Sequence, residues 1–577
     1  MKKKLLPALI VTGLIILVVI IMGITALINK YTPTKKTEDL KEYFNISSDD
    51  EAALIVDNEL SDYKAKIIDK KIYVDYKFVH DSLNSRFYWD ANENVLLYTT
   101  ASDIISAAAD SNSYSVTKQT NDFGYPIVKA TSDSALIALD YVKQYSNITF
   151  KSYDDPARIV ITSKWDEIDS ATVSKSTQVR VKGGIKSPIL KEVKKDDKIT
   201  ILDSGDKWDK VATEDGVIGY IKRKALSESK KTKLTNPDYE EETFTHIKKD
   251  KDICLAWNQV TSQSANSKVP QVISSTKGIN VMSPTWFYLN DNNGNLADIA
   301  SKDYVSYCHS QGIEVWGLFS NLENTDVDAA YVLTHTSTRT TLINQIMSAA
   351  FNYELDGVNI DFENITEAAY GDSYIEFIRE LSIKCHNNGI SLSVDVTVTA
   401  SFNKFFNRSD MANFADYIVI MGYDEHYKGS DAGSVSSIPW VTEGVESTLK
   451  EVPADQIILG MPFYTRIWEL TPKEDDDAVT DTEDQSKYTV ASQVYSMDAA
   501  AAQLATNNAT AALDEESGQN YAEWSVSNKL YKVWLEDTTS LEKRLKLVDD
   551  NKLAGAAFWK LGFENSSVWD TVIKYLN

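Results

Sequence analysis

The pattern of hydrophobic and polar positions divides the chain into three parts. A long uncharged run comes first, and short runs in which apolar and polar residues alternate follow it up to about residue 228. From His246 to the end, strand-like apolar runs alternate with helical patterns eight times. This alternation predicts an α/β TIM barrel with its active site at the carboxyl ends of the strands. The eight expected strands cover residues 253–257, 279–282, 313–319, 357–362, 390–398, 417–422, 457–464 and 554–559.

The first run predicts one N-terminal transmembrane helix. Lys2, Lys3 and Lys4 precede the uncharged residues 5–28, a stretch longer than the roughly 20 residues that cross a bilayer as a helix. A cleaved signal peptide would have a shorter apolar core followed by a small-x-small site. We therefore expect an uncleaved signal anchor over residues 1–30 in a single-pass protein of the cell membrane. Lysines on both sides leave the charge bias weak, so the extracellular placement of the catalytic domain depends on the shortness of the cytoplasmic stub.

Between the anchor and the large barrel, composition and turn signals predict two small domains. A polar, acidic juxtamembrane spacer over residues 31–62 is expected to lead to an α+β domain over 63–165 and a small β barrel over 166–228. A polar linker over 229–245 then leads to the TIM barrel over 246–577. A chain of 577 residues is too long for one ordinary core, which agrees with this division.

Both small domains resemble known bacterial modules. Tyr73-Val74 and Phe87-Tyr88-Trp89-Asp90 are similar to the domain named after the N-terminus of copper amine oxidases, although no His cluster accompanies them. Residues 166–228 resemble a bacterial Src-homology-type barrel, on the strength of Val179-x-Val181, Trp208-x-Lys210-Val211 and Gly216 followed by Gly219-Tyr220-Ile221. Such barrels often attach enzymes to cell-wall polymer. A plain spacer is the alternative, because a fold does not fix a function.

Charge and cysteine content exclude several classes of partner. The formal net charge is -25, with 84 acidic and 59 basic side chains, which argues against nucleic acid and against an anionic membrane surface as the main partner. The three cysteines, Cys254, Cys308 and Cys385, are too few for a disulfide framework and lack metal-ligand spacing. The sequence shows no nucleotide-binding glycine loop, metal motif or nucleophilic Ser/Cys arrangement, so no cofactor is expected.

The strongest chemical signal is a row of polar side chains on the fourth expected strand. Because side chains alternate between the two faces of a strand, Asn359, Asp361 and Glu363 should share one face, opposite the apolar Val358 and Ile360. Two acids and an amide on a core strand are costly to bury unless they perform chemistry. A Glu at the carboxyl end of such a strand is suited to the cleavage of glycosidic bonds. An exposed edge strand with scattered acids is the alternative.

This segment resembles glycoside hydrolase family 18, whose fourth strand carries Asp-Gly-x-Asp-x-Asp-x-Glu. The chain matches at Asp356, Gly357, Asp361 and Glu363 and differs at Asn359. Further strings similar to the family follow in the expected order. They are Met421-Gly422-Tyr423-Asp424, Gly460-Met461-Pro462-Phe463-Tyr464-Thr465-Arg466, Trp534-Leu535-Glu536-Asp537-Thr538-Thr539-Ser540 and Gly555-Ala556-Ala557-Phe558-Trp559.

The resemblance implies substrate-assisted hydrolysis with retention of configuration, an exception to the two-carboxylate scheme. Glu363 would protonate the leaving oxygen and later activate water. Asp361 would hydrogen-bond the nitrogen of the substrate's 2-acetamido group, whose carbonyl attacks the anomeric carbon. Tyr423 would contact the acetamido group from the other side, and Asp356 and Asn359 complete the catalytic set that the motif supplies. The expected substrate-binding residues are Asp424, which contacts the acetamido group, Trp559, which forms an apolar floor under the sugar, and Tyr464, Arg466 and Met421.

Asn359 makes one detail of this mechanism uncertain. With Asp at that position, two close carboxylates would share a proton. An Asn removes the repulsion, so we expect the pKa of Asp361 to be raised less, while the amide still hydrogen-bonds Asp361. Activity with an altered pH profile is the expectation, and a slow or degenerate enzyme is the alternative.

Taken together, these features predict a membrane-anchored glycosidase that cleaves β-1,4 bonds after N-acetylglucosamine. Peptidoglycan is the favoured polymer, because of the anchor, the small barrel and the absence of a Cys-rich chitin-binding module. A chitinase acting on chitin oligomers and a non-catalytic carbohydrate-binding or wall-tethering protein remain alternatives. The stretch from Glu469 to Trp524, with the acidic residues 474–477, is expected to form an insertion beside the cleft or a solvated loop.

Overall fold

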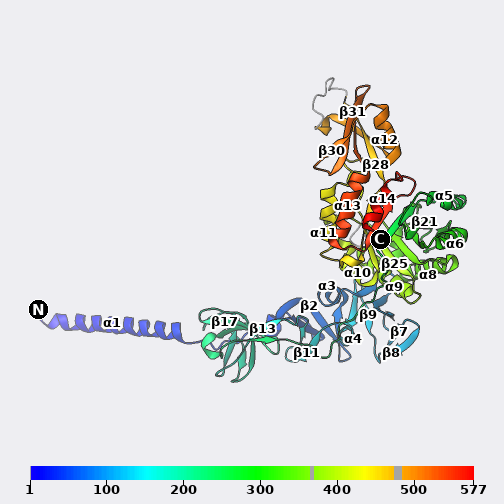
Figure 1. Cartoon of the computed structure of the whole chain (residues 1–577). Helices are drawn as coiled ribbons and strands as arrows, with labels where there is room; N and C mark the ends of the chain where they lie inside the picture. Colours follow the sequence, from blue (N-terminus) through cyan, green and yellow to red (C-terminus); the bar gives the residue numbers. More distant parts are fainter. Residues whose placement is uncertain (1, 364, 366–369, 474–483, 577) are drawn as a thin grey trace. The chain divides into compact units, whose positions relative to one another are not determined.

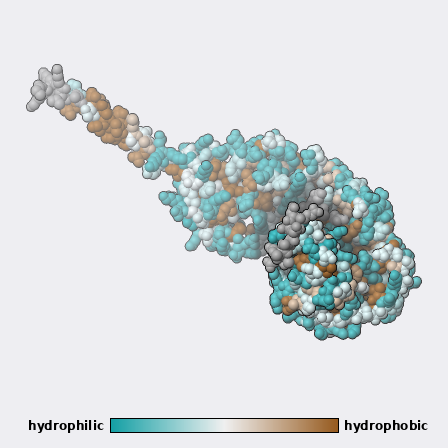
Figure 2. Space-filling model, turned by 90° about the horizontal axis from the view of Figure 1, so that it is seen from above, coloured by the Kyte–Doolittle hydropathy of each residue, from teal (hydrophilic) through white to brown (hydrophobic). Residues whose placement is uncertain are grey.

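The computed structural model describes residues 2–363, 365, 370–473 and 484–576. It begins with a helix of 30 residues, α1 (Lys2–Tyr31). Residues Leu9–Tyr31 of α1 are long and apolar enough to cross a membrane by length and composition, and their side chains are exposed as the brown surface in Figure 2. A single apolar helix near the N-terminus is also what a signal sequence would give.

The chain divides into two compact units, whose elements are labelled in Figure 1. The first unit contains residues 1–89, 107–114 and 120–241. One of its sheets has seven strands in the order β11-β12-β1-β2-β3-β10-β9. These are β1 (Glu51–Val56), β2 (Glu59–Ile68), β3 (Lys71–Asp75), β9 (Val128–Ala130), β10 (Ala135–Ala138), β11 (Thr149–Tyr153) and β12 (Arg158–Thr162), with helices α2 (Leu40–Tyr43), α3 (Tyr76–Ser82) and α4 (Leu139–Gln144).

This sheet starts earlier in the chain than the sequence suggested. Strands β1 and β2 lie within or begin within residues 31–62, which were expected to be a spacer. Ala52, Ala53 and Leu54 are completely buried, because β1 pairs in parallel with β12, about 100 residues further along the chain. The polar composition around β1 hid a strand whose partner is distant in sequence.

Where the small β barrel was expected, the first unit has a second seven-stranded sheet, in the order β15-β14-β18-β17-β16-β13-β19. Its core includes Val179, Val211 and Ile221, which are completely buried. The last strand pairs with β13 and lies within residues 229–245, so the expected linker begins with a strand. The strands are β13 (Glu167–Thr172), β14 (Thr177–Arg180), β15 (Ile189–Val193), β16 (Lys198–Asp203), β17 (Trp208–Thr213), β18 (Ile218–Lys222) and β19 (Lys230–Lys233).

The second unit contains the TIM barrel, which confirms the fold expected from the alternating pattern. Eight parallel strands pair in the order β20-β21-β23-β24-β25-β26-β27-β33, and β33 pairs with β20 to close the ring. They are β20 (Ile253–Asn258), β21 (Val281–Leu289), β23 (Glu314–Ser320), β24 (Gly357–Asp361), β25 (Ser391–Thr397), β26 (Tyr417–Met421), β27 (Ile457–Pro462) and β33 (Gly555–Trp559). Strand β22 (Leu296–Asp298) pairs with β21.

Two apolar layers hold the barrel together. Outside the strands, a large core packs them against helices such as α8 (Thr336–Tyr353), α9 (Gly371–His386) and α13 (Thr538–Asn551). Inside the ring, Trp257, Trp316 and Val419 belong to a separate buried cluster. The other helices are α5 (Val269–Val272), α6 (Lys302–Ser310), α7 (Ala329–Thr334), α10 (Arg408–Phe414), α11 (Ile438–Thr448) and α14 (Val568–Tyr575).

An antiparallel sheet is inserted between β27 and α13. Its five strands pair in the order β29-β28-β32-β31-β30. The insertion is thus a folded sheet with its own apolar clusters, and the acidic residues 474–477 lie outside the described residues. The elements are β28 (Tyr464–Pro472), β29 (Tyr488–Ser496), α12 (Met497–Thr506), β30 (Ala512–Asp514), β31 (Gln519–Val526) and β32 (Lys529–Leu535).

A segment from the N-terminal half of the chain also belongs to the second unit. Residues 90–106 and 115–119 are part of it, although they lie within the expected α+β domain. They contribute to a five-stranded sheet of β4 (Phe87–Asp90), β5 (Val95–Thr99), β6 (Ile104–Ala108), β7 (Ser113–Val116) and β8 (Gln119–Asp122). The barrel unit therefore does not begin at residue 246.

Hydrogen bonds fix this segment to two barrel helices. The carboxylate of Asp90 accepts from the backbone N–H of Thr336 at 2.7 Å, where it caps the first turn of α8. The hydroxyl of Thr99 donates to Oε1 of Glu376 on α9 at 2.7 Å, and both side chains are completely buried. Glu376 also pairs with Arg379 at 2.9 Å. A buried carboxylate depends on such partners for its stability.

Substitution of Thr99 by Val should therefore destabilise the barrel unit. The methyl group keeps the shape of the side chain but leaves Glu376 without one of its buried hydrogen bonds, which costs about 1–3 kcal/mol in the free energy of unfolding. Thr340→Val, at an exposed position of α8, is the matched control and should change little. Urea unfolding of the full chain, followed by tryptophan fluorescence, measures both. Equal stability of the two variants would contradict the role assigned to this contact.

Candidate active site

The expected row of polar side chains lies at the carboxyl end of β24. Asn359 and Asp361 are buried inside the ring, and Glu363 follows two residues after Asp361 at an exposed position. Protein groups nevertheless crowd Glu363, and this desolvation, followed by the negative charges of Asp424 and Glu323, raises its pKa above the usual value. A carboxyl group with a raised pKa can serve as a general acid near neutral pH.

The amide of Asn359 is held by residues from three other strands. Its Oδ1 accepts from Trp257 Nε1 at 3.0 Å and from Ser283 Oγ at 2.9 Å. Its Nδ2 donates to Ser393 Oγ at 3.0 Å and to Asp395 Oδ1 at 2.7 Å. Both donor positions are thus occupied by groups on β25, so the expected hydrogen bond to Asp361 is replaced by one to Asp395.

Asp361 is left with an incompletely bonded carboxyl group. Its Oδ1 is buried and has no hydrogen-bond partner among the described residues. Burial, followed by the charges of Asp395 and Glu363, raises the pKa of Asp361 well above its usual value. The expectation that Asn359 would leave this pKa less raised overlooked Asp395, which brings a second carboxylate from the neighbouring strand.

Aromatic side chains from β20, β33 and the end of β26 pack together inside the barrel. Trp257 packs edge-on against Tyr423 and Trp559, at ring-centroid distances of 6.4 and 5.9 Å. Burial, followed by the charge of Asp361, raises the pKa of Tyr423 well above its usual value, so its hydroxyl stays protonated. The structure thus places Tyr423 and Trp559 on the same side of the barrel, each in contact with Trp257.

Asp424, Tyr464 and Arg466 form a second group after β26 and β27. The Tyr464 hydroxyl donates to Asp424 Oδ1, and Arg466 Nη2 lies 3.8 Å from the same oxygen. Tyr464 packs edge-on against Tyr423 at 6.3 Å, which connects this group to the first. Met421 lines a cavity of about 130 Å³ together with Glu363 and Asp395. Four of the predicted substrate-binding residues therefore lie at the candidate site. They are Asp424, Tyr464, Arg466 and Met421.

Asp356 does not join the other predicted residues. It precedes β24, and its carboxylate accepts from the backbone N–H of Val315 at 2.8 Å and contacts His309 Nε2 at 2.7 Å. Five steps along the strand separate it from Asp361, or about 16 Å. At the amino end of β24, the hydrogen bonds of Asp356 hold the start of the strand in place, away from the catalytic residues.

The structure adds residues that the sequence analysis missed. Asn321 Oδ1 accepts from the backbone N–H of Glu363 at 3.0 Å, and Ser320 Oγ donates to Glu323 at 2.7 Å. Asp395 had a usable signal, because Ser391, Ser393 and Asp395 alternate along their strand just as the polar residues of β24 do. No comparable pattern marks Asn321 or Glu323, which follow the end of β23.

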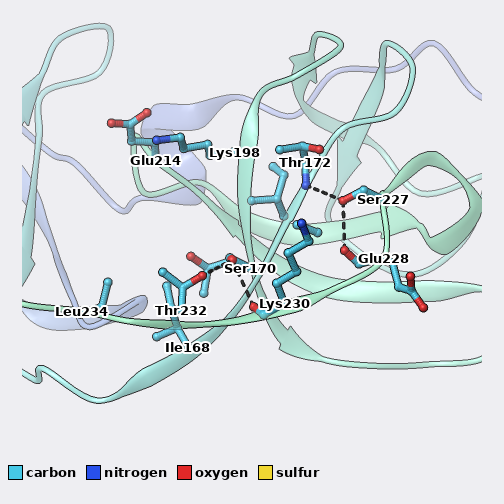
Figure 3. Close-up of a pocket in the computed structure, with 13 residues that line it drawn as sticks. Ile168, Ser170, Thr172, Lys198, Glu214, Ser227, Glu228, Lys230, Thr232 and Leu234 are labelled. Carbon is cyan, nitrogen blue, oxygen red and sulfur yellow. Dashed lines mark hydrogen bonds between the residues drawn. The ribbon is translucent and has the colours of Figure 1, made fainter.

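Another hollow lies at the seven-stranded sheet that contains β13 to β19, shown in Figure 3. Its volume is about 720 Å³, larger than the cavity at Glu363. Its polar groups bond to one another: Ser170 Oγ lies 2.6 Å from Thr232 Oγ1, and the backbone N–H of Thr172 donates to Ser227 Oγ at 3.0 Å. Glu214 pairs with Lys151 at 2.7 Å. This hollow lacks the row of buried acids found in the TIM barrel.

A TIM barrel with buried acids and aromatic side chains at its strand ends is an arrangement typical of glycosidases. Residues 319–564, less than half of the chain, match the family model described as Glycosyl hydrolases family 18. The fold, the acids and this match identify the protein as a glycosidase.

The individual proteins that the chain resembles share about a quarter of its residues or fewer over the matched region. The chain is 24% identical over 302 residues to "Uncharacterized glycosylase YvbX" of Bacillus subtilis (strain 168), covering 49% of this chain and 81% of the relative. It is 24% identical over 287 residues to "Cortical fragment-lytic enzyme" of the same organism, covering 48% of this chain and 63% of that protein. The crystal structure of the Bacillus cereus spore cortex-lytic enzyme SleL, at 18% identity, covers 60% of this chain and 79% of its own with a TM-score of 0.50. This last likeness concerns the fold alone.

Proposed function

We propose that the protein is a membrane-anchored, extracytoplasmic N-acetylglucosaminidase that cleaves β-1,4 bonds of peptidoglycan. The observation that carries the proposal is the placement of Asp361 and Glu363 together at the carboxyl end of β24, both with raised pKa values. Tyr423 and Trp559 pack against Trp257, which is bonded to Asn359 on the same strand, and they offer an aromatic surface to a sugar ring.

In the proposed reaction, the proton of Glu363 passes to the glycosidic oxygen as the bond from that oxygen to the anomeric carbon breaks. The carbonyl oxygen of the substrate's acetamido group attacks the same carbon and forms an oxazolinium ring. Asp361 accepts a hydrogen bond from the acetamido N–H and stabilises the positive charge that develops there. Glu363, now a carboxylate, removes a proton from water as it opens the ring, which retains the configuration and restores the acid.

Three features support peptidoglycan as the substrate. The apolar helix α1 would hold the enzyme at the outer face of the cell membrane, next to the wall. The small β barrel provides a second domain that could bind wall polymer. One relative is named a cortical fragment-lytic enzyme. Chitin is the second candidate, because its sugar carries the same 2-acetamido group on which the mechanism depends.

Glu363→Gln provides the test of this function. Native protein and variant, both as detergent-solubilised full chains, are incubated separately with peptidoglycan and with chitin oligomers, and products are identified by mass spectrometry. We expect reducing N-acetylglucosamine ends from peptidoglycan, with turnover at least about 100-fold lower for Glu363→Gln because the general acid is lost. Glu446→Gln, at an exposed position of α11, is the matched control and should retain activity.

Other outcomes would redirect the assignment. Cleavage of chitin oligomers alone would make the protein a chitinase. Binding of glycan without products from either polymer would favour a carbohydrate-binding or wall-tethering protein. Equal turnover by native protein and Glu363→Gln would refute the assignment of the acid.

The pH profile should respond to Glu323. Its negative charge raises the pKa of Glu363, so Glu323→Gln should lower that pKa and move the alkaline limb of kcat/KM to lower pH. The sign follows because Glu363 must be protonated to act as the acid, and a lower pKa empties that form earlier as pH rises. Gln can still accept from Ser320, which leaves the local hydrogen bond in place. An alkaline limb unchanged from that of Glu446→Gln would contradict this electrostatic role.

A further inference from the structure

Strand β25 carries a polar row that faces the row on β24. Ser391, Ser393 and Asp395 are buried and alternate with apolar residues. In the parallel pairing of the two strands, Asn359 is opposite Ser393 and Ile360 is opposite Val394. One further step in this register brings Asp361 opposite Asp395, and neighbouring strands lie about 4.8 Å apart. Two acidic side chains therefore project side by side into the same ring.

Asn359 fixes the orientation of Asp395. Its amide oxygen is held by Trp257 and Ser283, so its Nδ2 is aimed at β25 and donates to Asp395 Oδ1 at 2.7 Å. Asp395 also lines the cavity of about 130 Å³ that contains Glu363. Asp395 is thus hydrogen-bonded to β24 through Asn359, and it also faces the cavity that Glu363 lines.

The hydrogen bonds distribute charge unequally between the two acids. A donated hydrogen bond favours the ionised form of Asp395, whereas Asp361 Oδ1 has no partner among the described residues, which favours the protonated form. The titratable groups that face the pair are Glu363, Glu323, Tyr374 and Tyr423, all neutral or negative. Within the described part of the chain, no Lys or Arg forms an ion pair with either acid. Two buried carboxylates in such surroundings favour holding one proton between them.

We propose that Asp395 is the second carboxylate of the site and accepts the proton that Asp361 gives up when it accepts the acetamido N–H of the substrate. In this step the O–H bond of Asp361 breaks and an O–H bond forms on Asp395. The proton stays within the pair, so the net charge of the two carboxyl groups does not change. Asp395 is a positioning residue that acts through Asp361, and it supplies from β25 the acid that β24 lacks at Asn359. This inference rests on the proposed function and deepens it.

Removal of this acceptor should change the pH profile in a particular direction. In the native chain the acid limb of kcat/KM marks the pH at which the acceptor Asp395 becomes protonated while Asp361 still holds its proton. In Asp395→Asn the limb instead marks the pH at which Asp361 itself loses its proton to solvent. The limb therefore moves to higher pH, and kcat/KM at acidic pH falls by about tenfold or more. In the double variant Asn359→Asp/Asp395→Asn, an acid is again adjacent to Asp361, and the limb should return toward its native position. If Asp395 only holds Asn359 in place, activity falls equally at every pH and the double variant does not restore the limb.

A second measurement does not depend on turnover. The infrared C=O stretch of protonated carboxyl groups is recorded across pH on the detergent-solubilised full chain, and the contribution that Asp361→Asn removes is assigned to Asp361. We expect that band at neutral pH in the native chain, its titration at lower pH in Asp395→Asn, and its return in the double variant. The same titration in native protein and Asp395→Asn would overturn the inference.

These two measurements separate the possible failures. If the bands behave as expected but no glycan is cleaved, the charge coupling stands and the proposed function fails. If glycan is cleaved but Asp395→Asn shifts neither the acid limb of kcat/KM nor the titration of the Asp361 band, the proposed function stands and the role of Asp395 fails. Should Asp395→Asn not fold, Asp395→Ser is recorded in its place, because it also removes the acid: the Asp361 band should titrate at lower pH, and an unchanged titration refutes the coupling.

Discussion

The hydrogen bonds of Asn359 are the interaction on which the arrangement of the site depends. One amide inside the barrel connects β24 to β20, β21 and β25, and all its bonds are made by buried partners. An amide satisfied in this way cannot turn without leaving several buried groups unbonded, which is costly. The direction of the polar face of β24 is therefore fixed, and with it the direction in which Asp361 and Glu363 project.

Burial of the acids then determines their chemistry. Desolvation is the largest cause of the raised pKa values of Asp361, Glu363 and Asp395, and the neighbouring negative charges add to it. The cost of burying these groups is offset by the two apolar layers of the barrel. In the proposed mechanism, the same desolvation keeps a proton available on Glu363 for the glycosidic oxygen.

Local patterns predicted much of the fold and part of the site. The alternation around Ile360 and the eightfold repetition of strands and helices were enough to predict the barrel and the polar row, because both depend on residues close in sequence. The partners of Asn359 could not be predicted in this way, since Trp257 and Asp395 come from other strands and meet it only in the closed ring. The same reason explains β1, whose partner β12 is far along the chain. The prediction that Asp356 joins the catalytic residues did not hold for the opposite reason. Asp356 is close in sequence to Asp361 but lies at the other end of the strand.

The configuration of the first product tests the central claim most directly, because attack by the substrate's own acetamido group requires retention at the anomeric carbon. Proton NMR recorded during early turnover of an N-acetylglucosamine-containing glycan distinguishes the two anomers before they interconvert. The account predicts that the β anomer forms first. First appearance of the α anomer would mean that water attacks directly, and would contradict the roles proposed for Asp361 and Glu363.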